Sequence, residues 1–576
     1  MSIPDLSLTV LRRDYLRRRR TPREVIDAIL ERLPMFQDNP IWISRVPDAE
    51  LRARADRLAA QDPVSLPLYG VPFAIKDNID LAGLPTTAAC PAFAYRPAHS
   101  APVVERLIAA GAIPIGKTNL DQFATGLVGV RSPYGATRNA FNPDYIAGGS
   151  SSGSAVAVAQ GLASFALGTD TAGSGRVPAA FNGLVGLKPS RGLLSARGVV
   201  PACRTLDCVS IFTRNAVDAD AVFQVAAAFD PADPYARELA QAPAERRPRF
   251  LFGIPHSSQL EFFGNPAAAQ AFQDAVDRVQ RMGGEAVTLD FTPFLAVARL
   301  LYEGPWVAER YVAIADFIRR QPEALFPATR TIIEPATQLS AMQVFEAQYQ
   351  LQGLKRQTDA LLAGLEFILT PTAGTIYTVA EIEADPIRLN AQLGYYTNFM
   401  NLLDYSAVAV PAGAQDHGLP FGVTLFSFAG CDRQLLAWAE AFEQTADEPC
   451  IDLLVCGAHL SGLPLNPQLT ERGATLVEAT RTAPCYRLYA LAGGPPFRPG
   501  LVRDEGNGAG IEVEVWRLPL AALGSFMAGI PAPLGIGTVE VEGGRWVKGF
   551  ICESYALAAA TDITTYGGWR AYLASR

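Results

Sequence analysis

The chain has 576 residues, of which 49% are hydrophobic and 18% charged, and its formal net charge is −8. This length exceeds that of one ordinary domain, so we expect a large domain and a smaller one. The negative charge argues against a nucleic-acid partner, and no run of about eighteen uncharged apolar residues predicts a membrane span. The N-terminal segment lacks the hydrophobic core of a signal peptide, so we expect a cytoplasmic enzyme.

Helices and short strands alternate in the first part of the chain. Apolar residues recur at helical spacing over residues 21–61, and residues 101–110 and 155–162 also predict helices. Strands are predicted within residues 67–79 and at residues 112–116 and 164–167. This alternation predicts an α/β fold in which helices cover a central mixed β-sheet.

Residues 230–249 predict an exposed connector, and helices are predicted at 271–282, at 294–301 and from Pro305 toward Arg319.

The composition changes in the last quarter of the chain. Beyond residues 445–449, short β-rich runs alternate with turns rich in glycine and proline. We therefore expect two domains, residues 1–445 and residues 450–576, the second being a small β-rich α+β domain.

The eight cysteines are scattered and include no CxxC pair. This pattern predicts neither a zinc site nor a disulfide framework, and we expect no metal and no other cofactor. They are Cys90, Cys203, Cys208, Cys431, Cys450, Cys456, Cys485 and Cys552.

Two loops of small and hydroxyl-bearing residues stand out, Gly148–Ser154 and Gly168–Gly175. A serine hydroxyl becomes a good nucleophile only when a base removes its proton and hydrogen-bond donors stabilise the oxyanion. The first loop alone is equally typical of a flexible turn, and it does not continue into a phosphate-binding GxxxxGK[ST] motif. Together, the two loops favour a serine nucleophile.

Lys76 supplies a candidate base. It ends an apolar run, Val71–Ile75, and burial favours the neutral amine. Of the 49 basic residues only five are lysine and the rest are arginine, which cannot become neutral. An ordinary exposed lysine at a strand end is the alternative interpretation.

These segments resemble the amidase signature family, most strongly from residue 67 to residue 198 and loosely from residue 20 to residue 445. The resemblance is carried by the glycine-serine loop, by Gly168–Ala180 and by Gly186–Gly192. It implies a catalytic triad of Ser174 as nucleophile, Ser150 with a cis peptide as bridge, and Lys76 as base. It also implies an oxyanion hole formed by the N–H groups of Thr171, Ala172, Gly173 and Ser174. The chain departs from many members in having Ser152 and Ala172 in place of glycine.

A second interpretation is an α/β-hydrolase with Ser151 as the nucleophile, because residues 149–153 match the motif GxSxG. In an α/β-hydrolase this motif forms a sharp turn, the nucleophile elbow, directly after a buried strand. Here the preceding residues 138–145 are polar and turn-rich. This reading also requires His256, His417 or His459 as the base.

The C-terminal segment Val455–Asn466 resembles the start of the extra domain of allophanate hydrolases, which has a γ-glutamylcyclotransferase-like fold. This resemblance implies release of ammonia from allophanate, followed by decarboxylation of N-carboxycarbamate in the second domain. Tyr302, Arg310 and Gly126 are then the candidate substrate-binding residues, since an anionic substrate of an acidic chain needs a local cation. His459 is the candidate acid or orienting group of the second domain.

Glu553 is a weaker candidate than His459 for the second domain. We expect a homodimer and a functional partner in urea carboxylase, with neither nucleic acid nor membrane as a partner. Three other hypotheses stay open: an amidase of broader specificity whose tail is an assembly module, an amidotransferase component, and a non-catalytic scaffold.

Overall fold

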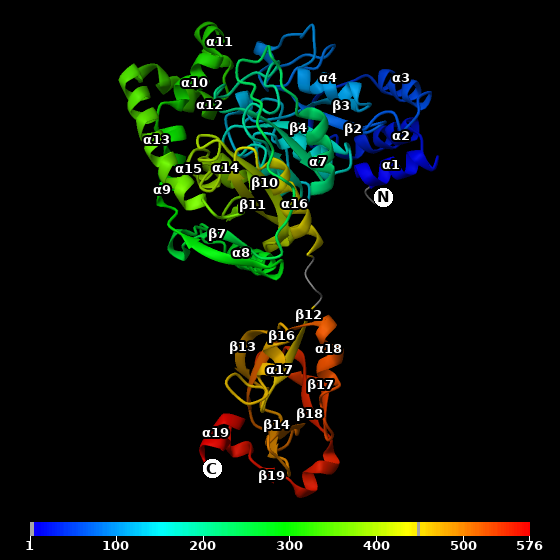
Figure 1. Ribbon diagram of the computed structural model, residues 1–576, viewed down its shortest axis with the longest axis vertical. Coiled ribbons are helices and arrows are strands. Elements are labelled where there is room, and N and C mark those ends of the chain that lie inside the picture. The colour runs from blue at the N-terminus through cyan, green and yellow to red at the C-terminus, as the bar shows by residue number, and fades with distance from the viewer. Residues whose placement is uncertain (1–4, 446–449) are drawn as a thin grey trace. The chain divides into compact units, whose positions relative to one another are not determined.

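The computed structural model describes residues 5–445 and 450–576, which form two compact units (Figure 1). The large unit ends at Thr445, and the small unit contains the described residues from Cys450 onward. Residues 446–449, within which we expected the boundary, lie outside the described part of the chain. No helix among the described residues is long and apolar enough to cross a membrane.

The described residues of the large unit form an 11-stranded sheet, in the order β1-β3-β2-β4-β6-β5-β10-β11-β9-β7-β8. β2 pairs in parallel with β3 and β4, whereas β4 pairs antiparallel with β6, so the predicted mixed sheet is confirmed. The strands are β1 (Trp42–Arg45), β2 (Pro72–Lys76), β3 (Ile113–Thr118), β4 (Phe165–Asp170), β5 (Val185–Lys188), β6 (Cys208–Thr213), β7 (Phe250–Pro255), β8 (Gly284–Leu289), β9 (Phe367–Pro371), β10 (Tyr405–Ala414) and β11 (Pro420–Phe428).

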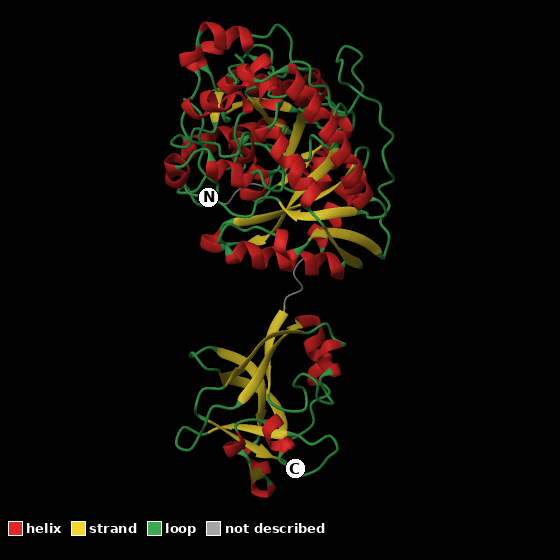
Figure 2. Ribbon diagram, turned by 90° about the vertical axis from the view of Figure 1, so that its left-hand side faces the viewer, coloured by secondary structure: helices red, strands yellow, loops and turns green. Residues whose placement is uncertain are grey.

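Helices pack around this sheet, as Figure 2 shows in red. Their starts carry recognisable signals: Thr21 and Glu24 form a capping box before α2, and Ser340 and Gln343 form another before α13. The helices of the large unit are α1 (Leu8–Leu16), α2 (Pro22–Arg32), α3 (Asp48–Ala59), α4 (Pro102–Ala109), α5 (Ser152–Ala159), α6 (Val177–Phe181), α7 (Ala216–Ala226), α8 (Pro266–Arg281), α9 (Thr292–Glu303), α10 (Trp306–Ala313), α11 (Ala315–Arg320), α12 (Pro327–Ile333), α13 (Ala341–Leu362), α14 (Val379–Ala384), α15 (Arg388–Leu393) and α16 (Asp432–Gln444).

Two helix predictions need correction. The helical pattern of residues 21–61 is interrupted by the edge strand β1, which pairs antiparallel with β3. Prolines at positions 34, 40 and 47 explain the interruption, because proline disfavours a continuous helix. The helix expected from Pro305 toward Arg319 is divided at Ile314 into α10 and α11. Residues 230–249 contain neither helix nor strand, as expected of a connector.

The small unit is rich in β-structure, with a five-stranded sheet in the order β13-β16-β12-β18-β17 and a three-stranded sheet in the order β15-β14-β19. β12 pairs antiparallel with β16 and parallel with β18. The strands are β12 (Cys450–Val455), β13 (Thr475–Arg481), β14 (Tyr486–Ala490), β15 (Pro499–Arg503), β16 (Glu512–Pro519), β17 (Leu534–Glu540), β18 (Trp546–Cys552) and β19 (Thr561–Asp562), and the helices are α17 (Pro467–Thr470), α18 (Leu520–Met527) and α19 (Trp569–Ala574).

The parallel pairing of β2 with β4 positions the chemistry of the large unit. Ile75 lies opposite Leu167, so the ends of the two strands meet at the same edge of the sheet. All residues of both strands are buried. The polar side chains that follow, beginning with Lys76 on β2 and Thr169 on β4, therefore converge in a dry environment.

Candidate active site

Lys76 ends β2 and is fully buried. Its Nζ lies 2.7 Å from Ser150 Oγ and 2.7 Å from Thr169 Oγ1. Burial lowers the pKa of the Lys76 amine to about 7, because a charged ammonium loses its hydration in the protein interior. Near neutral pH a substantial fraction of Lys76 can therefore act as a base.

Burial alone does not distinguish Lys76 from the other lysines. Lys117 and Lys188 are also fully buried, and Lys117 forms an ion pair of 3.0 Å with Asp77. Lys76 has no ion pair among the described residues, and it contacts the hydroxyl of Ser150 instead. The scarcity of lysine in the sequence therefore does not by itself identify the base, because three of the five lysines are buried.

Ser150 follows a cis peptide bond with Gly149, directly before α5. A Cβ at Gly149 would lie 2.1 Å from Asp121 Oδ2, so only glycine fits beside this carboxylate. Asp121 accepts hydrogen bonds from the N–H groups of Gly129 and Arg131, at 3.0 and 2.9 Å, and its own N–H donates to the Ser150 carbonyl at 3.1 Å. Asp121 thereby fixes the loop that carries Ser150, a role that no sequence motif indicates.

The loop after β4 carries Ser174 and is held by a buried ion pair. Asp170 accepts two hydrogen bonds of 2.9 Å from Arg176 and one of 3.0 Å from each of the N–H groups of Gly173 and Gly175. Both charged side chains are fully buried. These four bonds shape the loop before any substrate binds.

The oxyanion hole stays a prediction, and its four N–H groups differ in their contacts in this structure. Gly173 is engaged, since its N–H donates to Asp170. The backbone N–H groups of Thr171, Ala172 and Ser174 have no hydrogen-bond partner among the described residues. These three groups are the donors that remain open for an oxyanion.

Ser174 is 2% exposed, and its hydroxyl has no hydrogen-bond partner among the described residues. No hydrogen bond joins it to Ser150 in the described part of the chain, so the relay from Ser174 to Lys76 remains a prediction. The structure shows a Ser174 hydroxyl without a described partner, a Ser150 hydroxyl in contact with Lys76, and a lowered pKa for the Lys76 amine.

Of the three predicted substrate-binding residues, Arg310 and Tyr302 are in contact, and Gly126 is the sequence neighbour of a residue that Arg310 contacts. Arg310 on α10 is 2% exposed, and its guanidinium donates to Tyr302 Oη at 3.3 Å and to Thr125 Oγ1 at 3.2 Å. Gly126 follows Thr125, and a Cβ at Gly126 would lie 2.6 Å from Asp121 Oδ2. Arg310 has no carboxylate partner among the described residues, and its charge contributes to the lowered pKa of Lys76. A substrate anion could supply the missing partner.

Tyr302 also borders an open cleft of about 1430 Å³. Asn390 lies on another wall of this cleft, and its side chain accepts a 2.8 Å hydrogen bond from the N–H of Leu127. The cleft therefore adjoins the loop that contacts Arg310.

The alternative nucleophile Ser151 is not placed for catalysis. Its hydroxyl is buried and donates to the Thr169 carbonyl at 3.2 Å. The residues that precede it, 147–150, form bends and loop rather than a strand. The elbow geometry of an α/β-hydrolase is absent from this described segment, and His459 belongs to the other unit.

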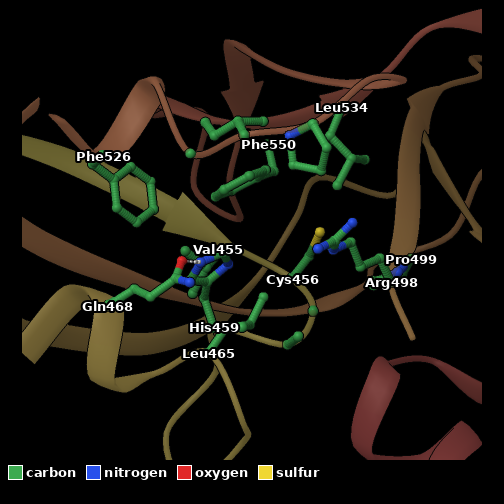
Figure 3. Close-up of a pocket in the computed structure, with 15 residues that line it drawn as sticks. Val455, Cys456, His459, Leu465, Gln468, Arg498, Pro499, Phe526, Leu534 and Phe550 are labelled. Atoms are coloured by element: carbon green, nitrogen blue, oxygen red, sulfur yellow. Dashed lines mark hydrogen bonds between the residues drawn. The ribbon is translucent and has the colours of Figure 1, made fainter. Parts of the chain in front are cut away.

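His459 lies in the loop after β12, in a pocket of the small unit (Figure 3). Its ring stacks on Phe550 at a centroid distance of 5.2 Å, and its Nε2 lies 3.1 Å from Gln468 Oε1. Burial lowers the pKa of His459, so the neutral imidazole is favoured. Glu553 is exposed and does not line this pocket, which leaves His459 as the candidate of the two.

The chain matches the Amidase family over residues 24–436 and the allophanate hydrolase C-terminal domain family over residues 451–574. It therefore belongs to the Amidase family and is an amidohydrolase with an appended domain of the allophanate hydrolase type. In structure it is similar to allophanate hydrolase from Kluyveromyces lactis, with a TM-score of 0.71 and 41% identity over 96% of this chain and 97% of that chain.

Two further relatives are urea amidolyases, which are longer proteins. Urea amidolyase of Saccharomyces cerevisiae is 43% identical over 95% of this chain and 32% of its own length. Urea amidolyase of Lachancea kluyveri is 43% identical over 96% of this chain and 32% of its own length. The chain thus spans about a third of the length of the urea amidolyases that it matches.

Proposed function

We propose that the large unit hydrolyses allophanate, with Ser174 as the nucleophile and Lys76 as the base that acts through Ser150. The observation that carries the proposal is the 2.7 Å contact between Lys76 Nζ and Ser150 Oγ, made by an amine whose pKa is about 7. The similarity to allophanate hydrolase and urea amidolyase supports this choice of substrate.

In the first step Ser174 Oγ attacks the amide carbonyl carbon. Its proton passes to Ser150, and the proton of Ser150 passes to neutral Lys76. The N–H groups of Thr171, Ala172 and Ser174 then stabilise the oxyanion. When the intermediate collapses, the proton returns through Ser150 to the leaving nitrogen, which departs as ammonia. Water hydrolyses the acyl-enzyme by the same relay.

Substrate selection follows from charge. Allophanate carries one carboxylate, and Arg310 is a buried guanidinium without an acidic partner among the described residues. A bidentate contact with the carboxylate would use Arg310, while Tyr302 would donate its hydroxyl. Gly126 would let the adjacent loop approach the substrate. A neutral amide of the same size would leave the guanidinium unpaired.

We propose a second step in the small unit, where His459 assists the decarboxylation of N-carboxycarbamate. The support is the histidine pocket of Figure 3 together with the match of residues 451–574 to the allophanate hydrolase C-terminal domain family. This step would release carbon dioxide and leave carbamate, which decomposes without a catalyst.

The test is a comparison of substrates with the full chain. Ammonia and carbon dioxide are measured from allophanate, acetamide and glutamine. We expect kcat/KM for allophanate to exceed the other two by about a hundredfold or more, in line with a charge-assisted contact that only allophanate can make. Equal rates on acetamide and allophanate would reject allophanate as the preferred substrate and favour an amidase of broader specificity.

We further propose a homodimer, formed through α13 of two copies. Met342, Phe345 and Tyr349 lie on one face of this helix and are 74%, 54% and 72% exposed. The same apolar face on a second copy can cover them in a symmetric contact. Light scattering should give twice the chain mass, and Phe345→Glu with Tyr349→Glu should give a monomer. A monomeric parent chain would contradict the proposal. Urea carboxylase as partner and the cytoplasm as location remain predictions.

A further inference from the structure

The histidine pocket of the small unit contains one charged side chain among its lining residues. That side chain is Arg498, which lies just before β15. The other side chains that matter here are His459, Gln468, Cys456, Phe526 and Phe550. Cys456 is neutral, because burial raises the pKa of its thiol to about 12. The electrostatic character of the pocket therefore depends on Arg498 and on the protonation of His459.

Arg498 has no acidic partner in the described part of the chain. Its Nε is buried and has no hydrogen-bond partner there, and its guanidinium takes part in none of the ion pairs. In Figure 3, Arg498 and Gln468 enter the pocket from different sides, with His459 between them. The buried Nε–H lacks a partner and the guanidinium is only partly buried, so an anion that enters the pocket can pair with it.

The remaining walls are apolar and shield the histidine. The ring of His459 lies 5.3 Å from that of Phe526 and 5.2 Å from that of Phe550. With Gln468 Oε1 as the acceptor, Nε2 carries the hydrogen, and Nδ1 carries the lone pair of the neutral ring. The positive charge of Arg498 also contributes to the lowered pKa of His459. An anion bound to Arg498 would reverse this effect.

We propose that Arg498 is the anion anchor of this pocket, where its guanidinium binds one carboxylate of a small dicarboxylate while the second carboxylate lies against Phe526 and Phe550. This inference rests on the proposed function, which supplies N-carboxycarbamate as the dicarboxylate. A carboxylate held against phenyl rings loses hydration, whereas neutral carbon dioxide does not. The apolar wall therefore favours loss of the carboxylate that Arg498 does not hold.

The proposed decarboxylation of N-carboxycarbamate consumes one proton. The bond between nitrogen and the departing carboxyl carbon breaks, and its electron pair stays on nitrogen. The nitrogen takes one proton from His459, whose imidazole first gains that proton from solvent once the bound dicarboxylate offsets the charge of Arg498. The products are carbon dioxide and carbamate, and carbamate remains bound to Arg498 until it dissociates.

The test uses the full chain and malonate, a stable dicarboxylate of the same shape. The chain has four histidines, so the ring signal of His459 can be followed by NMR and assigned from its loss in His459→Gln. Malonate should shift this signal and raise its titration midpoint. Arg498→Gln should weaken malonate binding about tenfold or more, and Arg498→Lys should retain part of it.

Two controls separate this inference from the proposed function. Malonamide, which is neutral, should leave the His459 signal unchanged. Arg310→Gln, in the large unit, should leave the response of His459 to malonate as it is in the parent chain. The other three histidines lie in the large unit and report only its folding, so folding of the small unit in Arg498→Gln is checked from the amide signals of that unit. An equal response of the parent chain and Arg498→Gln would overturn the inference. Since malonate is not turned over, failure to hydrolyse allophanate would reject the proposed function alone.

Discussion

Lys76 Nζ lies 2.7 Å from Ser150 Oγ, and both atoms belong to fully buried residues. Replacing Lys76 by methionine keeps the approximate length of the side chain and removes the base. We expect kcat/KM to fall by about a thousandfold or more, the range found for loss of general-base catalysis. Lys76→Arg should be equally inactive, because a guanidinium stays charged. Turnover by Lys76→Met at the rate of the parent chain would exclude Lys76 as the base.

We expect the pKa of Lys76 to determine how kcat/KM depends on pH. Only the neutral amine accepts a proton, so kcat/KM should rise with pH and level off above a midpoint near 7. Asp207 lies near enough to raise the pKa of Lys76 by its negative charge. Asp207→Asn should therefore move the midpoint to lower pH.

Thr171→Val is the matched control for Asp207→Asn. It removes the 2.5 Å hydrogen bond from Thr171 Oγ1 to Asp207 and keeps the carboxylate. Loss of this hydrogen bond raises the pKa of Asp207 further, so the midpoint of Thr171→Val should fall, but by less than in Asp207→Asn, which removes the charge altogether. A pH profile that is the same in the parent chain and in Asp207→Asn would argue against an electrostatic role for this carboxylate.

The choice of nucleophile can be tested with two serines from adjacent loops. Ser174→Ala should abolish turnover and leave the far-ultraviolet circular dichroism spectrum unchanged. Ser151→Ala should retain most of its activity, since its hydroxyl contacts only the backbone of Thr169, donating to the carbonyl and accepting from the N–H, and each such bond contributes about 1 kcal/mol. Loss of turnover in Ser151→Ala with retained turnover in Ser174→Ala would instead favour an α/β-hydrolase with Ser151 as the nucleophile.

Arg310 should affect anionic and neutral amides differently. Arg310→Met removes the buried guanidinium, so we expect KM for allophanate to rise about tenfold to a hundredfold. Acetamide has no carboxylate, and its KM should change little. Equal losses for both substrates would mean that Arg310 acts on the structure of the site rather than on the substrate carboxylate.

The ion pair of Asp170 and Arg176 should contribute to stability as well as to the shape of the loop. Asp170→Ala leaves Arg176 buried and unpaired, so the free energy of unfolding should fall by about 3–5 kcal/mol. Asp385→Asn breaks a partly exposed ion pair with Arg388 and should change the free energy of unfolding by less than about 1 kcal/mol. Thermal denaturation of both variants provides the comparison.

Much of the large unit was predictable because its strands and glycines are strong local signals. The apolar run before Lys76 is β2, and the two glycine-rich loops adjoin α5 and β4. β1 was missed because four residues between two helices carry little periodicity, and their pairing with β3 depends on residues far along the chain.

Site residues that belong to a sequence motif could be predicted, whereas residues that act through contacts between distant segments could not. Lys76 and Ser150 lie 2.7 Å apart, while the catalytic roles that the resemblance implies for them and for Ser174 remain predictions. The roles of Asp121 and Thr169 emerge only from the folded geometry, because each acts on a residue from another segment. The engagement of Gly173 by Asp170 likewise depends on the exact turn of the loop.

The burial of three of the five lysines has a practical consequence. Lys76, Lys117 and Lys188 are sealed in the interior, whereas Lys548 is exposed and Lys355 partly so. Reagents that acylate amines should therefore label the native chain sparingly and gain three new targets once the large unit opens. The extent of labelling, read by mass spectrometry, would report opening of the catalytic unit separately from events in the rest of the molecule.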